Sequence, residues 1–395
     1  REVTDQCWVV VSMQSNHSRK LSLFQNSSKN IVKRCWEILI IVYLGFWTIQ
    51  NFILQDRLSV SDPTDETSGI RRSLRNPLQS VSPPPVKQIH YNFTVAICVI
   101  VKDAEAYLEE WLDFHLLGVK FQNIYVYDNS DLFDLKQWYN NTRNHTIYSK
   151  VEVIHFPGNG YQKKQDDYIQ SIIYSDCVKR FGVDKNGPQH DYLALFDVDE
   201  FLVPQKEEYH DIRQILQDYL VPFGGALTVN WMLFGTSNKT LYAPIPLTKR
   251  FQYRDNRTHN VIKSIVKSSD FKAMRNPHAV TLKQDAQVHT TKYPGCLHKE
   301  AESTDTGASD YDFPSTVMLL YHYRYTSTKE YLQKRCARGN LSIRYIWCNS
   351  DDTLRNDTPP HIQPIPGEVF DDRAWQILTS HVPRYRMFEN WPDLS

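Results

Sequence analysis

Strand-like and helix-like segments alternate along this chain, and this predicts an α/β protein with a mixed, largely parallel sheet flanked by helices. Apolar runs typical of buried strands are followed by segments whose apolar residues recur every three or four positions. Acidic residues follow several of the strand-like runs. The chain has 395 residues, of which 41% are hydrophobic, enough for one large core. Alternation of this kind is typical of a sheet whose faces are covered by helices.

The pattern is most regular between residues 91 and 201. The expected strands are 93–101, 123–127, 150–156 and 191–196. The expected helices are 103–116, with Asp103 as a plausible N-cap, and 165–181. Acidic residues follow the strands at Asp103, at Asp128 with Asp131, and at Asp197 with Asp199. Ligands bind beyond the carboxyl ends of parallel strands, so these residues are expected at one edge of the sheet.

Beyond residue 201 the pattern is less regular. A strand at 226–234 runs into a loop of small and polar residues at 235–238. Further strands are expected at 261–266, 279–282 and 317–323. A helix is expected at 327–338, with Gly339 as its stop.

The most informative segment, residues 192–201, reads Tyr-Leu-Ala-Leu-Phe-Asp-Val-Asp-Glu-Phe. Residues i and i+2 of a strand point to the same side, so Asp197 and Asp199 would lie close together where the sheet meets solvent. Such a pair is costly unless a cation or a proton lies between the carboxylates. Hard divalent ions take oxygen ligands and are commonly shared with substrate phosphates. The segment therefore predicts a metal–phosphate site; the alternative is an Asp-rich turn after a core strand.

Charge argues against a nucleic-acid partner. Lysine and arginine together number 45, as do aspartate and glutamate, and no dense basic run is present. Aromatic residues make up 13% of the chain, which suits sugar or base stacking and equally an ordinary packed core.

The N-terminal part has the organisation of a membrane anchor. Residues 38–54 form an apolar run that just reaches the length of a span, with basic residues on its N-terminal side. We therefore expect a cytoplasmic tail at 1–35, a signal-anchor transmembrane helix at 36–54 and a stem at 55–90. A globular domain at 91–345 and a C-terminal extension at 346–395, packed on that domain, would follow. The alternatives for the apolar run are a buried core helix or a cleaved signal.

Glycosylation sequons and cysteines agree with a lumenal location. Seven Asn-x-Ser/Thr sequons follow the apolar run, beginning at Asn92, Asn140, Asn144, Asn238, Asn256, Asn340 and Asn356. Five cysteines lie in the same region: Cys98, Cys177, Cys296, Cys336 and Cys348. An oxidising lumen permits disulfides, but an odd number leaves at least one cysteine without an intramolecular partner. The pairing cannot be derived from the sequence.

An ordered series of motifs resembles the family 92 glycosyltransferases, within the larger group of GT-A folds. The matching pieces are Cys98–Glu105, Tyr107–His115, Tyr127–Ser130, Gln170–Cys177, Phe196–Phe201, Trp231–Ser237 and His322–Tyr325. They cover roughly residues 93–340 in the order of the family. The resemblance implies a GT-A-type, Rossmann-like sheet in a single catalytic domain. It also implies the plan of a Golgi type II membrane glycosyltransferase with a lumenal catalytic domain.

The resemblance further implies inverting transfer of a sugar from a nucleotide-sugar to a glycan acceptor on a glycoprotein, glycolipid or polysaccharide. Members are often galactosyltransferases, so UDP-galactose is the leading donor. The implied cofactor is Mn²⁺, or Mg²⁺ in its place, bridging the donor diphosphate and acting as a Lewis acid.

Site residues follow from the same resemblance. The expected metal ligands are Asp197, Asp199 and His322, with a satisfied surface or core histidine as the alternative for His322. Expected on the donor side are Lys102, Asp103, Asp128 and Asp197, with a solvated lysine and an Asx-turn as the alternatives for Lys102 and Asp128. Trp231, Gly235 and Ser237 are expected on the acceptor side, and core packing is the alternative for Trp231.

The general base that inversion requires is not fixed by any spacing. The weak candidates are Glu200, Asp255 and Glu300, together with Asp285, while His278 and His289 would serve in binding. Tyr174, on the helix before the Asp197 strand, is expected to pack rather than to make a polar contact.

Two other function classes remain open at this point. A haloacid-dehalogenase-like phosphatase also places Asp-x-Asp after an apolar strand, with the first aspartate as nucleophile; its usual residue two positions past the second aspartate is replaced here by Phe201. A catalytically inactive, glycan-binding homologue would keep the fold for binding alone.

Overall fold

The computed structural model of the chain divides into two compact units, Arg1–Val86 and Lys87–Ser395. The structure describes residues 90–130, 134–142, 146–156, 169–182, 189–298, 315–334, 348–349, 355 and 363–391, all within the second unit. The expected tail and signal-anchor, and nearly all of the stem, lie outside these residues. None of the helices that are described is long and apolar enough to cross a membrane.

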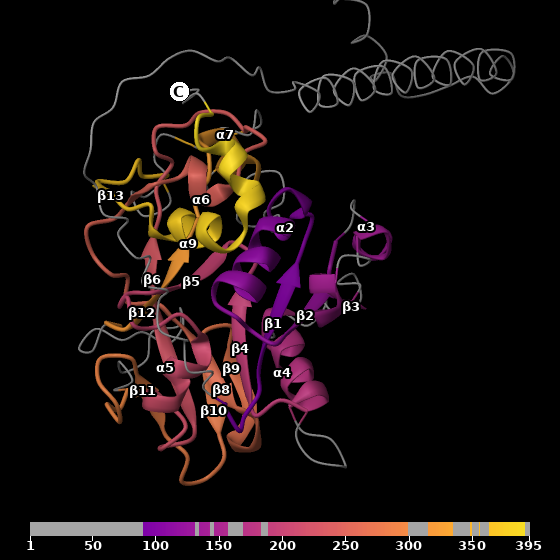
Figure 1. Cartoon of the computed structure of the whole chain (residues 1–395), viewed down its shortest axis with the longest axis vertical. Helices are drawn as coiled ribbons and strands as arrows, with labels where there is room; N and C mark the ends of the chain where they lie inside the picture. The colour runs from indigo at the N-terminus through magenta and orange to yellow at the C-terminus, as the bar shows by residue number, and fades with distance from the viewer. Residues whose placement is uncertain are drawn as a thin grey trace, which may run out of the picture. The chain divides into compact units, whose positions relative to one another are not determined.

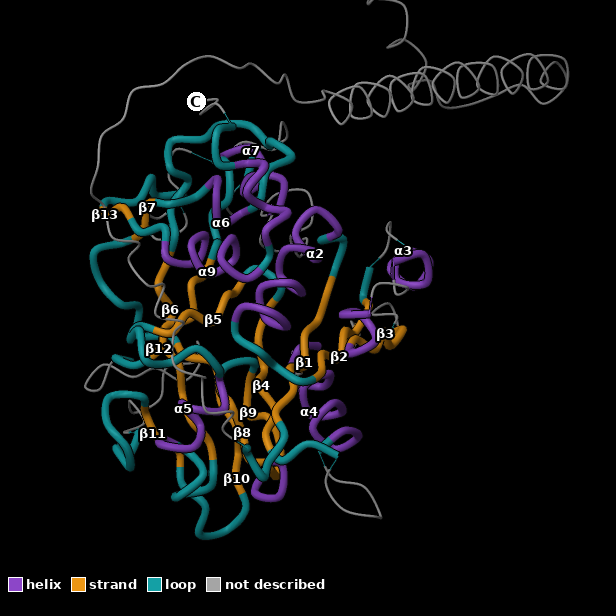
Figure 2. Tube along the Cα trace, in the orientation of Figure 1, coloured by secondary structure: helices purple, strands orange, loops and turns teal. Residues whose placement is uncertain are grey.

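A mixed sheet forms the centre of the described unit (Figures 1 and 2). Its strands follow the order β3-β2-β1-β4-β8-β6-β12-β5, and β11 pairs with β6. In chain order they are β1 (Val95–Val101), β2 (Asn123–Asp128), β3 (Val151–His155), β4 (Tyr192–Asp197), β5 (Glu200–Pro204), β6 (Ala226–Leu233), β8 (Ile262–Lys267), β11 (Val288–Thr290) and β12 (Met318–His322). Two small ribbons lie outside it, β9 (Phe271–Asn276) with β10 (Ala279–Leu282), and β7 (Tyr253–Arg254) with β13 (Val369–Phe370).

The pairing directions confirm the mixed, largely parallel α/β sheet. Strands β1 to β4 pair in parallel, as do β6 with β12 and with β11. The antiparallel pairs are β4 with β8, β8 with β6, and β12 with β5. The described helices are α2 (Glu105–Asp113), α3 (Leu135–Thr142), α4 (Ile169–Phe181), α5 (Ile212–Tyr219), α6 (Leu247–Arg250), α7 (Thr328–Leu332) and α9 (Arg373–His381).

Both faces of the sheet are buried, which explains why the central strands are apolar at successive positions. In β1, Val95, Ile97, Val99 and Val101 belong to one hydrophobic cluster, whereas Ala96 and Cys98 belong to another. The first cluster also contains residues of α2, α5 and α9, and the second contains residues of α4. The sheet is therefore a central layer, with helices on its two sides.

A disulfide joins the sheet to α4. Cys98 of β1 and Cys177 of α4 are both fully buried and are bonded to each other across a sequence separation of 79 residues. Cys348 is also disulfide-bonded, whereas Cys296 is a buried free cysteine. The expectation that at least one cysteine lacks an intramolecular partner agrees with Cys296.

Three local expectations were wrong or incomplete. Helix α2 begins at Glu105 with Ala104 as its N-cap, and Asp103 instead adopts a positive φ of 43°. The turn after Asp197 leads into β5, a strand that was not expected and that returns antiparallel to β12. The α-helical part α7 spans Thr328–Leu332 and begins at a capping box of Ser327 and Glu330, and residues 333–334 continue it as a π-helical turn, whereas residues 335–339 of the expected helix and its stop lie outside the described residues.

The C-terminal segment packs on the rest of the described unit. Helix α9 contacts α6, β5 and the π-helical turn Phe114–Gly118 that continues α2. Farther along, the Tyr385 hydroxyl donates a hydrogen bond of 2.9 Å to the buried carboxylate of Asp113. The residues after 363 thus complete the layer that covers one face of the sheet.

Candidate active site

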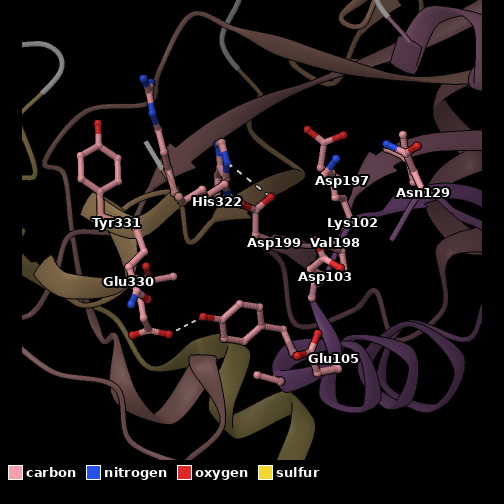
Figure 3. Close-up of a pocket in the computed structure, with 18 of the residues that line it drawn as sticks. Lys102, Asp103, Glu105, Asn129, Asp197, Val198, Asp199, His322, Glu330 and Tyr331 are labelled. Atoms are coloured by element: carbon pink, nitrogen blue, oxygen red, sulfur yellow. Dashed lines mark hydrogen bonds and ion pairs between the residues drawn. The ribbon is translucent and has the colours of Figure 1, made fainter. Parts of the chain in front are cut away.

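A cavity of about 900 Å³ opens at the carboxyl ends of the parallel strands. Its walls come from the segments that follow β1, β2, β4 and β12, together with the N-terminal turns of α2 and α4 and with α7. Figure 3 shows side chains from these separate segments facing a common space. The volume lies in the range of pockets that bind small molecules and cofactors.

Strand register places the acidic motif in this cavity. Ile100 of β1 is paired with Asp197 of β4, and Val101 is paired with Asp128 of β2, so the ends of the three strands are level. His322, the last residue of β12, pairs with Glu200 at the start of β5. The antiparallel return of β5 therefore brings His322 beside the Asp-x-Asp turn, although the two are more than a hundred residues apart in the sequence.

Asp197 is held by three neighbouring groups. Its Oδ1 accepts hydrogen bonds from Nε2 of Gln170 at 2.9 Å and from the Tyr174 hydroxyl at 2.7 Å. Nζ of the fully buried Lys263 lies 3.0 Å from the same oxygen. Tyr174 therefore makes a polar contact as well as packing, contrary to expectation. These partners fix the orientation of the carboxylate at the cavity wall.

The charges around Asp197 are balanced within the protein. Burial alone would raise the pKa of Asp197, but the Lys263 ammonium offsets it and lowers that pKa below its usual value. Burial would lower the pKa of Lys263, yet Asp197 and Glu200 raise it, so the ammonium stays charged. Glu200 is fully buried, and burial together with the negative charge of Asp197 raises its pKa well above the usual value. The positive charge of Lys263 thus lies between the carboxyl groups of Asp197 and Glu200 and offsets negative charge in the buried trio.

Asp199 faces the other side of the motif and meets His322 and Lys334. Nε2 of His322 lies 3.6 Å from Oδ1 of Asp199, longer than a normal hydrogen bond (Figure 3). The ammonium of Lys334, just beyond α7, contacts Oδ2 of Asp199. Burial would raise the pKa of Asp199, but Lys334 and His322 hold it well below its usual value. Burial lowers the pKa of His322 below its usual value, although the neighbouring Asp199 carboxylate opposes this.

These residues fit a divalent cation in part. His322 is 6% exposed, and its Nδ1 has no hydrogen-bond partner, so the ring is a buried and incompletely satisfied imidazole beside a carboxylate. A neutral imidazole and a carboxylate oxygen are suitable ligands for Mn²⁺. Asp197, by contrast, is already paired with the Lys263 ammonium. Among the residues that the structure describes, no group of three or more histidine, cysteine, aspartate or glutamate side chains is arranged to hold a metal ion.

The donor-side candidates divide into those that line the cavity and one that does not. Lys102, Asp103 and Asp197 line it, and Asp103 combines this position with a backbone conformation that is rare for a residue with a side chain. Asp128 lies behind the wall, where its Oδ1 accepts a 3.0 Å hydrogen bond from the Ser130 amide in an Asx-turn. Its neighbour Asn129 faces the cavity instead.

The acceptor-side candidates lie outside this cavity. Trp231 is buried behind the site, where its ring centroid is 4.3 Å from that of His322. Gly235 packs against the chain at residues 366–367, and a Cβ atom there would lie 2.3 Å from the Gly367 nitrogen. The Ser237 amide donates to the carbonyl of Pro366 at 2.9 Å. The loop at 235–237 is therefore built into the backbone packing of the C-terminal segment.

None of the described candidates for the general base lines the cavity. Glu200 is fully buried, its Oε2 accepting a 2.8 Å hydrogen bond from the Asp197 amide, and Asp255 is not part of the cavity wall. Asp285 and His289 are likewise not part of that wall, and Nδ1 of His278 donates a 3.2 Å hydrogen bond to the carbonyl of Ile262. Glu300 lies outside the described residues.

A polar network on the α2–α7 side of the cavity was not expected from the sequence. The Tyr107 hydroxyl donates to Oε1 of Glu330, as the dashed line in Figure 3 shows. The guanidinium of Arg250 binds both oxygens of the same carboxylate at 3.0 and 3.1 Å. The capping box that begins α7 was recognisable from Ser327 and Glu330, but the bonds to Tyr107 and Arg250 cross 223 and 80 positions of sequence.

With this geometry established, the chain was compared with known proteins. The profile of glycosyltransferase family 92 matches residues 91–368, which include every described residue of the cavity wall. The chain belongs to glycosyltransferase family 92. No curated protein matched it.

Several solved structures show a limited likeness to this family 92 chain. They include the WbbM bifunctional glycosyltransferase without ligand (14% identity, 35% of this chain and 23% of that one, TM-score 0.23). Core-mannan synthase A from Aspergillus fumigatus, in its Mn/GDP form, has 13% identity over 45% and 52% of the chains, with a TM-score of 0.21. An active-site mutant of LgtC has 11% identity over 58% and 86%, with a TM-score of 0.27. We base no conclusion on likenesses of this size.

Proposed function

We propose that this family 92 glycosyltransferase transfers a sugar from a nucleotide-sugar to a glycan acceptor with inversion, assisted by a divalent cation. The observation that supports the proposal most strongly is the position of Asp199 and His322. They meet at the carboxyl end of β4, on the wall of a cavity large enough for a nucleotide-sugar. The leading donor is UDP-galactose, because galactosyl transfer is common in the family.

In this proposal the nucleoside end of the donor lies against the ends of β1 and β2. Lys102 and Asn129 line the cavity there and offer an ammonium and an amide to ribose or phosphate. The diphosphate lies toward Asp199, His322 and Lys334. Lys334 is 55% exposed at its side chain, so its ammonium can turn from Asp199 to a phosphate oxygen without burying a new charge.

Asp199 and His322 would hold the cation, which we propose to be Mn²⁺ or Mg²⁺. When bound, the ion offsets the negative charge that develops on the leaving nucleotide. Asp197 would not bind the cation directly but would act through a water molecule or contact the ribose, because it is already paired with the Lys263 ammonium. The buried ammonium of Lys263 keeps the motif from carrying excess negative charge before the donor arrives.

We propose a lumenal location in the Golgi, with a signal-anchor helix at 36–54 and the catalytic domain beyond a stem. The apolar run at 38–54 and the seven sequons that follow it favour this topology. The buried Cys98–Cys177 disulfide is consistent with an oxidising compartment. A glycosidase-sensitive shift in gel mobility of the full chain from secretory cells would test it; unmodified sequons throughout would contradict it.

The function is tested by screening nucleotide-sugars with the purified full chain, with and without Mn²⁺. We expect one donor to raise the melting temperature and to be hydrolysed slowly, both in a manner that depends on the cation. A chain that binds oligosaccharides but neither binds nor hydrolyses any donor would instead be the inactive, glycan-binding homologue. A covalent phospho-aspartate after exposure to a phosphate ester would support the phosphatase alternative.

A further inference from the structure

A second cavity adjoins the first on the α2 side. It has a volume of about 310 Å³ and shares two lining residues, Ala106 and Tyr242, with the larger cavity. The remaining walls come from Glu109 and Glu110 of α2, from the segment at 244–246 and from residues 384–388 of the C-terminal segment. Ala106 and Tyr242 therefore stand between the two cavities.

Tyr242 is exposed and yet supported. Half of its surface is accessible to solvent, which is unusual for a large aromatic residue at a cavity wall. The guanidinium of Arg250 lies 5.1 Å from the centroid of its ring. That guanidinium is itself buried and bound to both carboxylate oxygens of Glu330. The Tyr242 ring thus packs on a guanidinium that Glu330 holds in place, and its exposed surface lines the two cavities.

The lining of the smaller cavity suits a carbohydrate chain. Pro244, Ile245 and Pro246 supply apolar surface, and Met387, which is 74% exposed, faces the same space. The carboxylate of Glu109 and the guanidinium of Arg384, 2.7 Å apart, supply groups for hydroxyl hydrogen bonds. A pyranose ring has an apolar CH face and a rim of hydroxyl groups, which is the complement of this surface.

The larger cavity indicates the direction in which the acceptor saccharide would extend. In the proposed donor pose the nucleoside end lies at the strand ends, where Figure 3 places Asn129 and Asp197 together. Glu330 lies across the same view from Asn129, on the α2–α7 side that carries Tyr107 and continues to Tyr242. The transferred sugar, and the hydroxyl that receives it, would therefore be nearer to Tyr242 than the nucleoside is.

We propose that Tyr242 and the smaller cavity bind the saccharide units of the acceptor that lie beyond the unit receiving the sugar. The inference depends on the proposed glycosyltransferase activity and adds to it a binding site for a glycan chain of two or more units. It predicts that a long acceptor benefits from this cavity and that a monosaccharide acceptor does not.

The test compares Tyr242→Ala with the wild-type full chain on matched acceptors. The probes are galactose- and N-acetylglucosamine-terminated trisaccharides and the corresponding monosaccharides. Loss of one aromatic stacking contact is expected to raise the KM for the trisaccharide by about five- to tenfold. Tyr242→Trp should restore trisaccharide binding. Because Tyr242 also lines the larger cavity, the unchanged controls are measured on Met387→Glu, whose residue lines only the smaller one: its monosaccharide KM, donor KM and slow donor hydrolysis are expected to stay within about twofold.

Two further variants separate the site from general effects. Tyr293→Ala removes a tyrosine of similar exposure, 53%, just after β11 and so at the opposite end of β6 from the cavities, and it should change nothing. Met387→Glu places a charge on the smaller cavity without touching Arg250, and it should weaken the same trisaccharides. Saturation-transfer NMR of each trisaccharide with the full chain reports binding without turnover.

The outcomes distinguish the two proposals. If the wild type neither binds nor turns over any nucleotide-sugar, the proposed function fails and the inference fails with it. If the wild type is active but Tyr242→Ala and Met387→Glu leave every trisaccharide KM and NMR contact unchanged, the inference alone is overturned. It is also overturned if only glycoprotein acceptors, and no free trisaccharide, depend on Tyr242, because the cavity would then accommodate polypeptide.

Discussion

Replacing Asp199 with asparagine removes one negative charge from the proposed cation site while keeping the shape of the side chain. Nε2 of His322 lies 3.6 Å from Oδ1 of Asp199, so a cation held between them would lie within about 4 Å of the carboxylate. One charge of the ion attracts the carboxylate by about 4 kcal/mol at about 4 Å and an effective dielectric constant of about 20, and the second charge of the ion adds to this. Displacing the half-exposed Lys334 from Asp199 offsets at most about 1 kcal/mol. The net loss is therefore at least about 3 kcal/mol, which corresponds to a cation affinity weaker by roughly a hundredfold or more.

The assay is calorimetric titration of Mn²⁺ into the full chain in the presence of UDP. Asp199→Asn should lose cation binding at accessible concentrations while its melting temperature changes little, because the partner left behind, Lys334, is more than half exposed. Asp218→Asn is a control that removes an exposed carboxylate of α5, which accepts a hydrogen bond from the Tyr209 hydroxyl and does not line the cavity. Unchanged Mn²⁺ affinity in Asp199→Asn would refute the reasoning.

The remaining predictions concern the groups that support the site. Lys263→Met should lower the free energy of unfolding by about 3 to 5 kcal/mol, because it leaves the Asp197 charge without its cation; a loss under about 1 kcal/mol in urea titration would contradict this. The Cys98→Ser/Cys177→Ser double variant should lose about 2 to 4 kcal/mol, and a melting temperature equal to that of the wild type would argue against a structural disulfide. Burial lowers the pKa of His115 to about 3 in the folded protein. In the unfolded chain the same imidazole takes up a proton below about pH 6.5. The stability present above pH 6.5 is therefore lost as the pH falls toward 3, by about 1.4 kcal/mol per pH unit. His115→Gln should flatten that slope in denaturant titrations between pH 6.5 and 4, and an unaltered slope would contradict the assignment.

Much of the fold was predictable because it is encoded locally. The strands that became β1, β2, β4, β6 and β12 are continuous apolar runs, and each was placed within two residues of its observed bounds. The turn at Asp197 and Asp199 was recognisable for the same reason, since it interrupts such a run with two charges. The return of β5 was not, because a five-residue strand that begins with a buried glutamate has no distinctive pattern.

The counter-ions of the site could not be predicted from the sequence. Lys263 stands in the strand Ile-Lys-Ser-Ile-Val-Lys, whose polar residues suggest an exposed face, yet residues 262–266 are all buried and the lysine is fully so. Only the tertiary structure shows that it meets Asp197, 66 positions earlier in the chain. Lys334 reads as a solvated residue near the end of a helix, and its contact with Asp199 depends on how α7 is placed over the strand ends.

The central claim is that Asp199 and His322 hold a divalent cation against the diphosphate of a sugar nucleotide. A crystal structure of the full chain grown with UDP and Mn²⁺, with anomalous scattering used to locate the metal, tests it most directly. The account predicts an anomalous peak in contact with both side chains and with the diphosphate, and an Asp199 that no longer pairs with Lys334. UDP bound without a metal peak, with Lys334 still on Asp199, would contradict it.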